Sequence, residues 1–211
     1  MICLQHLYKR YPVLQGEERP VLEDFSLELP ERGAVCLFGP SGCGKTTLLH
    51  ILAGLTRPDA GIVTGTEGKR LSMVFQEDRL LPWLTAAQNV ALALPGSAVL
   101  PKREELAAAR SLLDQMGLGE AAEQKPDQLS GGMRRRVAIA RALACQGELL
   151  LLDEPFKGLD GVVKDRVIHQ IVRMKGEALV LFVTHDLQEA QALADRTLRF
   201  SGPPLSLEET V

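Results

Sequence analysis

The sequence predicts an α/β fold with a mainly parallel core sheet, an antiparallel β edge and a helical subdomain. Three observations lead to this prediction. Short, continuously apolar segments recur along the chain, and such segments are typical of parallel strands that are covered on both faces. A glycine-rich loop separates one of these segments from a segment with helical spacing. From roughly residue 86 to residue 144, the strand-like segments give way to helical periodicity.

The antiparallel edge is predicted in the first part of the chain. Two β-prone segments, Ile2–Tyr8 and Val21–Leu29, flank a turn-rich stretch that holds Pro12, Gly16 and Pro20. Because turn residues over a short connection let neighbouring strands pair side by side, we expect these two segments to be antiparallel.

The core sheet is predicted to begin with a strand at Ala34–Phe38. The glycine-rich segment Gly39–Gly44 ends this strand, and helical spacing of leucines then extends over Lys45–Leu55. A further short strand is predicted at Ser72–Phe75.

The helical subdomain contains two clear helix predictions. The first covers Lys102–Met116, has its apolar residues on one face and stops at Gly117. The second covers Gly131–Ala144 and follows Ser130, whose hydroxyl group can cap a helix.

After this subdomain the chain returns to alternating strands and helices. Continuous apolar segments predict buried strands, and apolar residues at helical intervals predict the helices between them. In order, these elements are a strand at Leu149–Leu152, a helix that carries Val163, Val167, Ile171 and Met174, a strand at Leu179–Val183 and a short helix from Leu187.

Composition limits the possible classes of protein. The chain has 211 residues, of which 45% are hydrophobic, so we expect one domain over residues 1–211 with a substantial core. The formal net charge of -3 argues against nucleic acid as a partner, which usually requires a basic excess or a basic face. The four cysteines show no CxxC spacing, so we expect reduced thiols without a metal role.

No segment is expected to cross a membrane. The longest apolar runs, Leu149–Leu152 and Ala178–Val183, fall far short of the roughly 20 residues that a helical span needs. Met1–Arg10 lacks the features of a signal peptide, so we expect the chain to stay in the cytosol. The sequence ends at Val211 without a further extension, so a C-terminal regulatory domain is not expected.

One motif predicts phosphate binding. Residues 39–46 match the pattern G-x4-G-K-[ST] and lie between a predicted strand and a predicted helix, which is the context that the motif requires. Backbone N–H groups after Pro40 would surround the β-phosphate, Lys45 would add charge toward the β- and γ-phosphates, and Thr46 would supply a Mg²⁺ ligand. A glycine turn without a ligand is the alternative. The ATP-binding residues predicted here are Gly39, Pro40, Ser41, Gly42, Cys43, Gly44, Lys45, Thr46 and Thr47.

Two carboxylates follow a buried strand. Asp153 and Glu154 come at the carboxyl end of the predicted strand Leu149–Leu152, where ligands of open α/β sheets bind. We expect Asp153 to lie near Mg²⁺ and Glu154 to polarise the water that attacks the γ-phosphate. Two acids that merely face solvent at a strand end are the alternative.

A third motif points to one family. Leu129–Met133, with the sequence LSGGM, opens a helix with a hydroxyl cap and two residues that lack side chains, and a basic helix follows. This arrangement resembles the signature of ABC-type ATPases, which are phosphate-loop NTPases. The resemblance implies that Ser130, Gly131 and Gly132 bind the γ-phosphate held by a second copy of the chain. An isolated helix cap is the alternative.

Other positions of that family also have counterparts in this sequence. By resemblance, Gln76 senses the γ-phosphate, contacts Mg²⁺ and faces a membrane partner. In the same way Asp160 belongs to a loop that crosses the dimer interface, and His185 is the switch histidine. An aromatic ring stacks on adenine in this family, and Tyr11 is the best-aligned candidate, with Tyr8 as the alternative.

Two positions depart from the usual family pattern. Arg135 stands where a glutamine is more usual, and Lys157 with Gly158 replaces smaller neutral residues before Asp160. We expect neither departure to touch a catalytic position and both to alter the dimer interface. The segment Gly54–Gln76 is short for the family. The sequence therefore does not decide whether the edge hairpins of the family are present in this segment.

The resemblance extends to a branch of importers. The segments Val74–Val90 and Asp153–Phe156 are similar to the nitrate, sulfonate and taurine branch, with thiamine-precursor importers nearby. This implies ATP and Mg²⁺ as cofactors, and as partners a second copy, transmembrane permease subunits and, indirectly, a solute-binding protein. The expected location is the cytoplasmic side of the cell membrane.

Trp83, in the apolar cluster Leu80–Leu84, is expected beside the permease docking groove, with core packing as the alternative.

Three other functions are alternatives to import. An exporter uses the same nucleotide machinery and stays an alternative. A soluble ABC-type ATPase that acts on nucleic acid or ribosomes usually has a long coiled coil or two tandem cassettes, and the sequence has neither. A binding module without catalysis is disfavoured because Lys45, Glu154 and His185 are all present.

Overall fold

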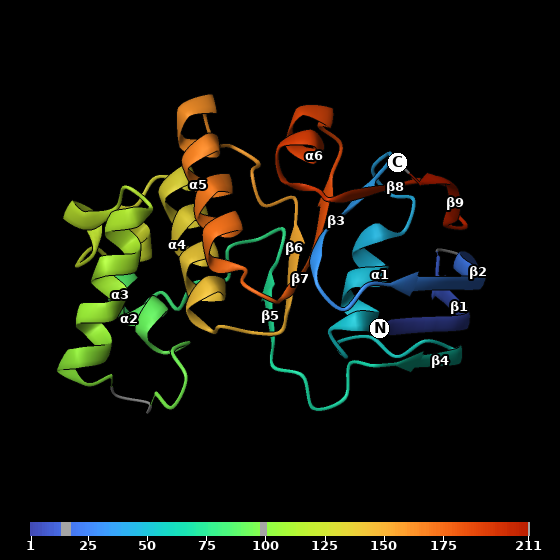
Figure 1. The fold of residues 1–211 in the computed structure, drawn as a ribbon, viewed down its shortest axis with the longest axis horizontal. Coiled ribbons are helices and arrows are strands. Elements are labelled where there is room, and N and C mark those ends of the chain that lie inside the picture. The colour runs from blue at the N-terminus through green and yellow to red at the C-terminus, as the bar shows by residue number, and fades with distance from the viewer. Residues whose placement is uncertain (14–17, 98–100, 211) are drawn as a thin grey trace. The chain divides into compact units, whose positions relative to one another are not determined.

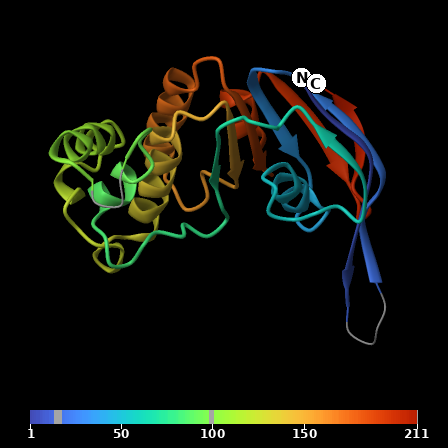
Figure 2. The same ribbon diagram turned by 90° about the horizontal axis from the view of Figure 1, so that it is seen from below.

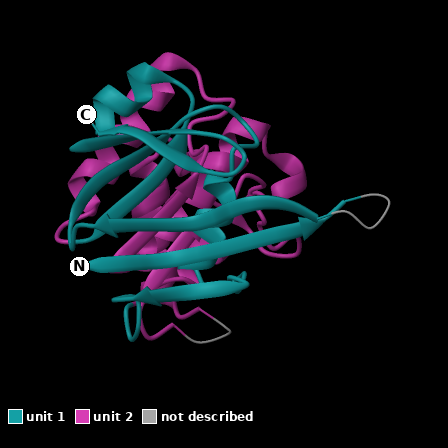
Figure 3. Cartoon of the chain, turned by 90° about the vertical axis from the view of Figure 1, so that its right-hand side faces the viewer, with its two compact units in different colours: residues 1–69, 178–211 teal, residues 70–177 magenta. Residues whose placement is uncertain are grey.

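The computed structural model describes residues 1–13, 18–97 and 101–210. The chain divides into two compact units, which Figure 3 shows in different colours. Unit 1 comprises Met1–Lys69 and Ala178–Val211, and unit 2 comprises Arg70–Glu177. The single domain over residues 1–211 stays a prediction.

A three-stranded antiparallel sheet opens unit 1. Its strand order is β2-β1-β4, with β1 at Ile2–Pro12, β2 at Glu18–Leu29 and β4 at Ala60–Thr64. Figure 2 shows β1 and β2 as a long two-stranded ribbon. Apolar side chains on one face of this sheet, among them Leu4 and Leu22, are fully buried. The predicted antiparallel edge is confirmed.

Both strands of this ribbon are longer than the sequence predicts. Pro12 is the last residue of β1, and Pro20 lies within β2 opposite Arg10, although the turn signals place both prolines in a loop. A proline is tolerated at a strand end or in an edge strand, because its missing N–H is not needed there for pairing. Gly16, which belongs to the same predicted turn, lies outside the described residues.

The second sheet region of unit 1 has the strand order β7-β3-β8-β9. β3 pairs in parallel with β7 and with β8, whereas β8 and β9 are antiparallel. Helix α1 follows β3 and helix α6 follows β7 (Figure 1). The bounds are β3 Gly33–Phe38, α1 Lys45–Leu52, β7 Leu179–Thr184, α6 Leu187–Leu193, β8 Arg196–Ser201 and β9 Ser206–Thr210.

Unit 2 combines a parallel strand pair with helices. Strands β5 and β6 pair in parallel, and Val74 lies beside Leu152 at their carboxyl ends. Helices α4 and α5 run side by side in this unit (Figure 1). The bounds are β5 Leu71–Val74, α2 Ala86–Ala91, α3 Arg103–Gln115, α4 Gly131–Ala144, β6 Leu149–Asp153 and α5 Gly161–Met174, with 3-10 turns at Gly119–Ala121 and Pro126–Gln128.

The parallel strands lie in the core as their apolar sequences predict. Every residue of β6 and of β7 is buried, and so is the middle of β3. Three strands are missing from the sequence-based prediction, namely β4, β8 and β9. Within the described ranges, no helix combines the length and the apolar character that a bilayer crossing requires.

Candidate functional site

The predicted phosphate loop joins β3 to α1 in unit 1, and its glycines are required by the backbone. A Cβ atom on Gly39 would lie 2.4 Å from the carbonyl oxygen of Phe200, which is too close for any side chain. Gly44 has a φ of 120° and would place a Cβ atom 2.9 Å from Val21. The loop therefore passes tightly between β8 and β2, and only glycine fits at both positions.

Lys45 is the first residue of α1, and its side chain turns back under the loop. The Nζ atom donates hydrogen bonds to the carbonyl oxygens of Gly39, at 2.9 Å, and Pro40, at 2.7 Å. Although Lys45 is only 6% exposed, its charge is held by oxygen acceptors, as a buried ammonium group requires. Thr46 is exposed at the helix start, where backbone N–H groups have no acceptor in the helix.

The turn that carries His185 is fixed by hydrogen bonds in unit 1. The Thr184 hydroxyl donates to the carboxylate of Glu189 and accepts from the Asp186 N–H at 3.0 Å. The sequence analysis does not identify Glu189, which supports the turn that carries His185. An acidic residue four positions after His185 is the sequence feature that could have indicated it. His185 and the loop line one pocket of about 310 Å³, whose residues are Phe38, Gly39, Pro40, His185, Arg199, Phe200 and Glu208.

The predicted adenine-stacking residue lies on the β1–β2 ribbon. Tyr11 is 36% exposed and pairs with Arg19 across the two strands. The Nζ atom of Lys9 lies 5.5 Å from the centre of its ring. Tyr8 is partly buried and pairs with Ala60 of β4. Tyr11 therefore has the more accessible ring, and its stacking on adenine stays a prediction.

In unit 2, two of the predicted catalytic residues, Gln76 and Glu154, follow neighbouring strand ends, whereas Lys45 and His185 lie in unit 1. Because β5 and β6 are parallel and in register, the residues that follow them emerge at the same edge. Gln76 is exposed there, and Asp153 is 2% exposed. Glu154 has a φ of 46°, a left-handed conformation that costs a non-glycine residue about 1–3 kcal/mol. Its carboxylate oxygen Oε2 lies 3.2 Å from Nζ of Lys157.

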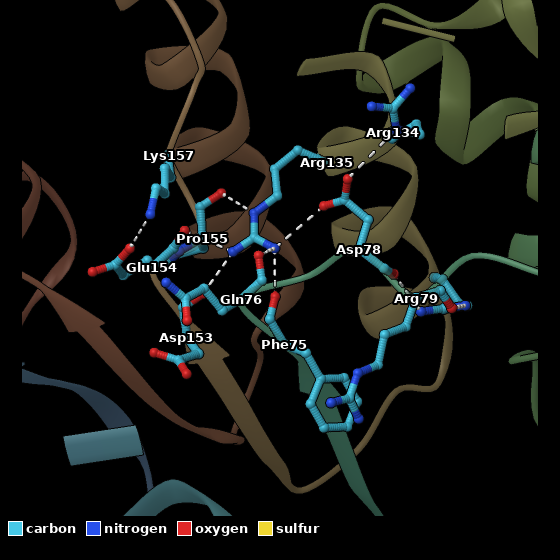
Figure 4. A network of polar contacts seen from close by, with 11 residues as sticks. Phe75, Gln76, Asp78, Arg79, Arg134, Arg135, Asp153, Glu154, Pro155 and Lys157 are labelled. Atoms are coloured by element: carbon cyan, nitrogen blue, oxygen red, sulfur yellow. Dashed lines mark hydrogen bonds and ion pairs between the residues drawn. The ribbon is translucent and has the colours of Figure 1, made fainter. Parts of the chain in front are cut away.

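The guanidinium group of Arg135 lies at these same strand ends (Figure 4). It donates to the carbonyl oxygens of Asp153, Glu154 and Pro155, and also to those of Phe75 and Gln76. The expectation that Arg135 touches no catalytic position is therefore wrong, and its effect on a dimer interface stays a prediction. The parallel pairing of β5 and β6 directs both strand ends at this helix face, so the side chain is used inside unit 2.

For Lys157 too, the expectation of no contact with a catalytic position is wrong, whereas its effect on a dimer interface stays a prediction. Its ammonium group forms an ion pair with the carboxylate of Glu154, the predicted water-polarising residue. The tight turn after β6 brings the two side chains together, since they stand three residues apart. Lys157 is 61% exposed, so this ion pair contributes little to stability but can restrict where the carboxylate points.

The signature residues form a second cluster in unit 2. Ser130 caps α4, because its hydroxyl oxygen accepts the Met133 N–H at 3.3 Å. Ser130 and Gly131 are exposed, and a Cβ atom on Gly132 would lie 3.3 Å from the carbonyl oxygen of Gly158. Asp160 is exposed and caps α5 by accepting the Val163 N–H at 3.0 Å. The cluster thus presents two capped helix starts to solvent.

Comparison with known proteins decides the family. A family model described as ABC transporter matches residues 22–157. The chain belongs to the ABC transporter family. It is similar to the taurine import ATP-binding protein TauB of Pseudomonas aeruginosa, with 44% identity over 200 residues, 90% of this chain and 75% of that protein. The nitrate import ATP-binding protein NrtD of Synechococcus elongatus is 38% identical over 213 residues, 96% of this chain and 77% of that protein.

A solved structure agrees with this assignment. It is the dimeric structure of a post-hydrolysis state of an ATP-binding cassette bound to ADP and Pi. The match has a TM-score of 0.88 and 30% sequence identity, and it covers 100% of this chain and 98% of that chain. The predicted fold class and the likeness to the nitrate and taurine branch are confirmed. This ABC family member binds ATP and is an ATPase.

Proposed function

We propose that the chain powers a membrane importer for a small solute such as taurine, another sulfonate, nitrate, bicarbonate or a thiamine precursor. The observation that carries the proposal is the similarity, over nine-tenths of the chain, to a protein named for taurine import. The nitrate and bicarbonate transport proteins that also match handle small anions. Direction and substrate are thus inferred from relatives, while hydrolysis is assigned to residues of this chain.

In this proposal the phosphate loop binds the ATP phosphates. Lys45 neutralises charge on the β- and γ-phosphates, and the N–H groups at the start of α1 donate to phosphate oxygens. Tyr11 stacks on adenine. Thr46 and Asp153 suit Mg²⁺, because a hydroxyl and a carboxylate offer the oxygen ligands that this hard cation prefers. Mg²⁺ held by them would neutralise charge that develops on the β- and γ-phosphate oxygens.

The proposed chemistry belongs to the strand ends of unit 2 and to the switch histidine. Glu154 orients the attacking water and accepts its proton, which fits a carboxylate that is 17% exposed and held near Lys157. Gln76 and His185 contact the γ-phosphate region and report its presence. The roles of Glu154, Gln76 and His185, and that of Asp153 as a Mg²⁺ ligand, are proposals that substitution can test.

The proposed active form has two copies of the chain. Ser130, Gly131 and Gly132, with Asp160, are proposed to contact the ATP that is bound by the phosphate loop of the other copy. What supports this is their exposure at two capped helix starts, since N-terminal helix ends attract phosphate. Transmembrane permease subunits and a solute-binding protein complete the importer, with this chain at the cytoplasmic face.

An uptake panel tests the proposed function. In the source organism, Lys45→Ala at the chromosomal locus should abolish uptake of one labelled member of a set of taurine, other sulfonates, nitrate, bicarbonate and thiamine precursors. Uptake of the others should be unchanged. If every uptake rate is normal and the cells instead retain a compound that the parent strain exports, the proposal of import is wrong.

A separate prediction concerns docking of the permease beside Trp83. Trp83 is 66% exposed, so the alternative of core packing is wrong. The loop that presents it is held by buried Asn89, whose side chain bonds to the backbone of Leu81, Leu84 and Thr85. An exposed apolar side chain on a restrained loop is suited to an interface. We expect Trp83→Cys to form a cross-link to a permease subunit with a short bifunctional reagent.

Matched cysteines make this experiment selective. Val172 also lies in unit 2 and is 45% exposed. Val172→Cys should give no cross-link. Cys3 and Cys145 are partly exposed and should be replaced by serine, whereas burial raises the pKa of Cys36 to about 12 and keeps that thiol unreactive. Failure of both Leu80→Cys and Trp83→Cys to cross-link in an assembled complex would count against docking at this loop.

A further inference from the structure

We propose that Arg135 is a positioning residue for ATP hydrolysis. Its guanidinium group holds the backbone of Glu154 and the backbone of Gln76 in a fixed relative placement. The inference rests on the proposed function, because it acts through the two residues that the proposal assigns to the γ-phosphate. It goes further because Arg135 contacts neither nucleotide nor water in that proposal and belongs to none of the phosphate-binding motifs.

The geometry of the two strands creates the need for such a residue. Strands β5 and β6 end side by side, with Val74 beside Leu152, and each then continues into an irregular segment. Gln76 lies in the segment after β5, and Glu154 lies in the segment after β6. Beyond the strand ends, ladder hydrogen bonds no longer fix the two segments to each other. Figure 4 shows the Arg135 side chain reaching from α4 into the space between them.

On the β6 side, Arg135 binds three consecutive carbonyl groups. Its Nη2 atom donates to the carbonyl oxygens of Asp153 and Glu154, each at 2.6 Å, and its Nε atom donates to that of Pro155 at 3.0 Å. These three carbonyls surround the left-handed backbone of Glu154. A strained conformation persists only where its surroundings hold it, and Arg135 supplies that restraint here.

On the β5 side, the remaining Nη1 atom completes the connection. It donates to the carbonyl oxygen of Phe75, with a longer contact of 3.5 Å to that of Gln76. It also lies 3.3 Å from Oδ1 of Asp78. One planar group therefore bonds to both strand ends, so movement of one segment is transmitted to the other.

This role depends on arginine. A guanidinium group presents five N–H donors in a rigid plane, whereas the side-chain amide of glutamine, usual at this position in the family, has two on a shorter side chain. Arg135 is 3% exposed, so water does not substitute for its contacts. Burial lowers the pKa of Arg135, and the carboxylate of Asp78 raises it, which makes Asp78 the counterion of this buried charge.

The first experiment measures ATP hydrolysis by Arg135→Gln. We expect kcat to fall about tenfold to a hundredfold, because displacing catalytic groups by about 1 Å costs on that order. KM for ATP should change less than about twofold, since the hydrogen bonds described for Arg135 go to residues outside the phosphate loop. Arg135→Lys, which keeps the charge but loses the planar donors, should lie between the variant and the parent.

The control is Arg110→Gln. Arg110 lies on α3 of the same unit and bonds to Glu123, away from the strand ends and the signature residues in the hydrogen bonds described for it. The melting temperatures of the two variants show how much stability each substitution costs. Only Arg135→Gln should lower kcat. Equal losses of kcat in the two variants would mean that Arg135 acts through general stability, and the proposal would be wrong.

A double-mutant cycle tests whether Arg135 acts through Glu154. Single-turnover hydrolysis is measured for Arg135→Gln, Glu154→Gln and the double variant. If Arg135 positions Glu154, adding Arg135→Gln to Glu154→Gln should slow hydrolysis by less than about threefold, because the positioned group is already lost. Losses that multiply in full would overturn the proposal.

Failure of this inference can be told apart from failure of the proposed function. If Lys45→Ala abolishes hydrolysis while Arg135→Gln keeps kcat within twofold of the parent, Arg135 has no positioning role and the proposed function stands. If Lys45→Ala also keeps its activity, the assigned nucleotide site is wrong. Should Arg135→Gln fail to fold, Arg135→Lys and Asp78→Asn carry the same test, and a normal kcat in both would overturn the proposal.

Discussion

Lys45→Ala is expected to remove nearly all ATP hydrolysis, at least about a hundredfold, and to weaken ATP binding. The ammonium group is held directly below the phosphate loop by the carbonyl oxygens of Gly39 and Pro40, so it can act on phosphate charge without a change of backbone. The fold should persist, because Pro40 is exposed and water can reach its carbonyl oxygen, so that only the buried carbonyl oxygen of Gly39 loses a partner, at a cost of about 1–3 kcal/mol. Phosphate release and nucleotide binding measure the loss, and thermal unfolding checks the fold.

A control lysine separates local from general charge effects. Lys102 is exposed at the start of α3 in unit 2, and it belongs neither to the strand ends of β5 and β6 nor to the signature residues. Lys102→Ala removes the same net charge as Lys45→Ala. It should hydrolyse ATP at the parent rate. Activity of Lys45→Ala within twofold of the parent would show that this segment is not the phosphate-binding loop.

The sequence predicts the buried elements of this fold well and the exposed ones poorly. Strands β6 and β7 have no exposed residue, so burial on both faces produced the continuous apolar runs that identify them. Strand β9 has only exposed residues and β4 has four, so neither carries an apolar signal. In β8 the buried residues Leu198 and Phe200 stand on either side of the partly exposed Arg199, and the strand is held by pairing with β3, a contact that local sequence does not encode.

The same difference applies to the candidate site. Motif residues could be placed in advance, because glycine loops, strand-end acids and helix caps are local patterns. The contacts of Arg135 could not, since its partners Gln76 and Asp78 are 59 and 57 residues away in the sequence. Only the packing of α4 against the ends of β5 and β6 brings these groups together. Lys157 stands three residues from Glu154, yet the turn that joins them is visible only in the fold.

Glu154→Gln should separate ATP binding from ATP hydrolysis. A glutamine keeps the shape of the side chain and can orient a water molecule, but it cannot accept a proton. Losing a positioned general base commonly costs about a hundredfold to ten-thousandfold in rate. The variant should therefore bind ATP normally and hydrolyse it very slowly, measured as single-turnover phosphate release alongside equilibrium binding of ATP.

Lys157→Gln distinguishes loss of the base from loss of its ion pair. The substitution removes the contact of 3.2 Å to Glu154 but leaves the carboxylate in place. Because Lys157 is 61% exposed, solvent limits this ion pair to about 1 kcal/mol, and we expect a change in rate of less than about fivefold. If Lys157→Gln were as slow as Glu154→Gln, the ion pair rather than the base would limit hydrolysis.

The slow variant also tests the shared site of two copies. If ATP is held by the phosphate loop of one copy and by Ser130–Gly132 of the other, ATP joins the chains and hydrolysis parts them. Glu154→Gln should then accumulate as a dimer with saturating ATP and depleted Mg²⁺, visible as earlier elution in size-exclusion chromatography. Ser130→Arg in the same background should restore the monomer, because a large side chain at the exposed cap of α4 would obstruct the phosphate. Elution of Glu154→Gln as a monomer with ATP bound, and no effect of Ser130→Arg, would show that the shared site is wrong for this chain.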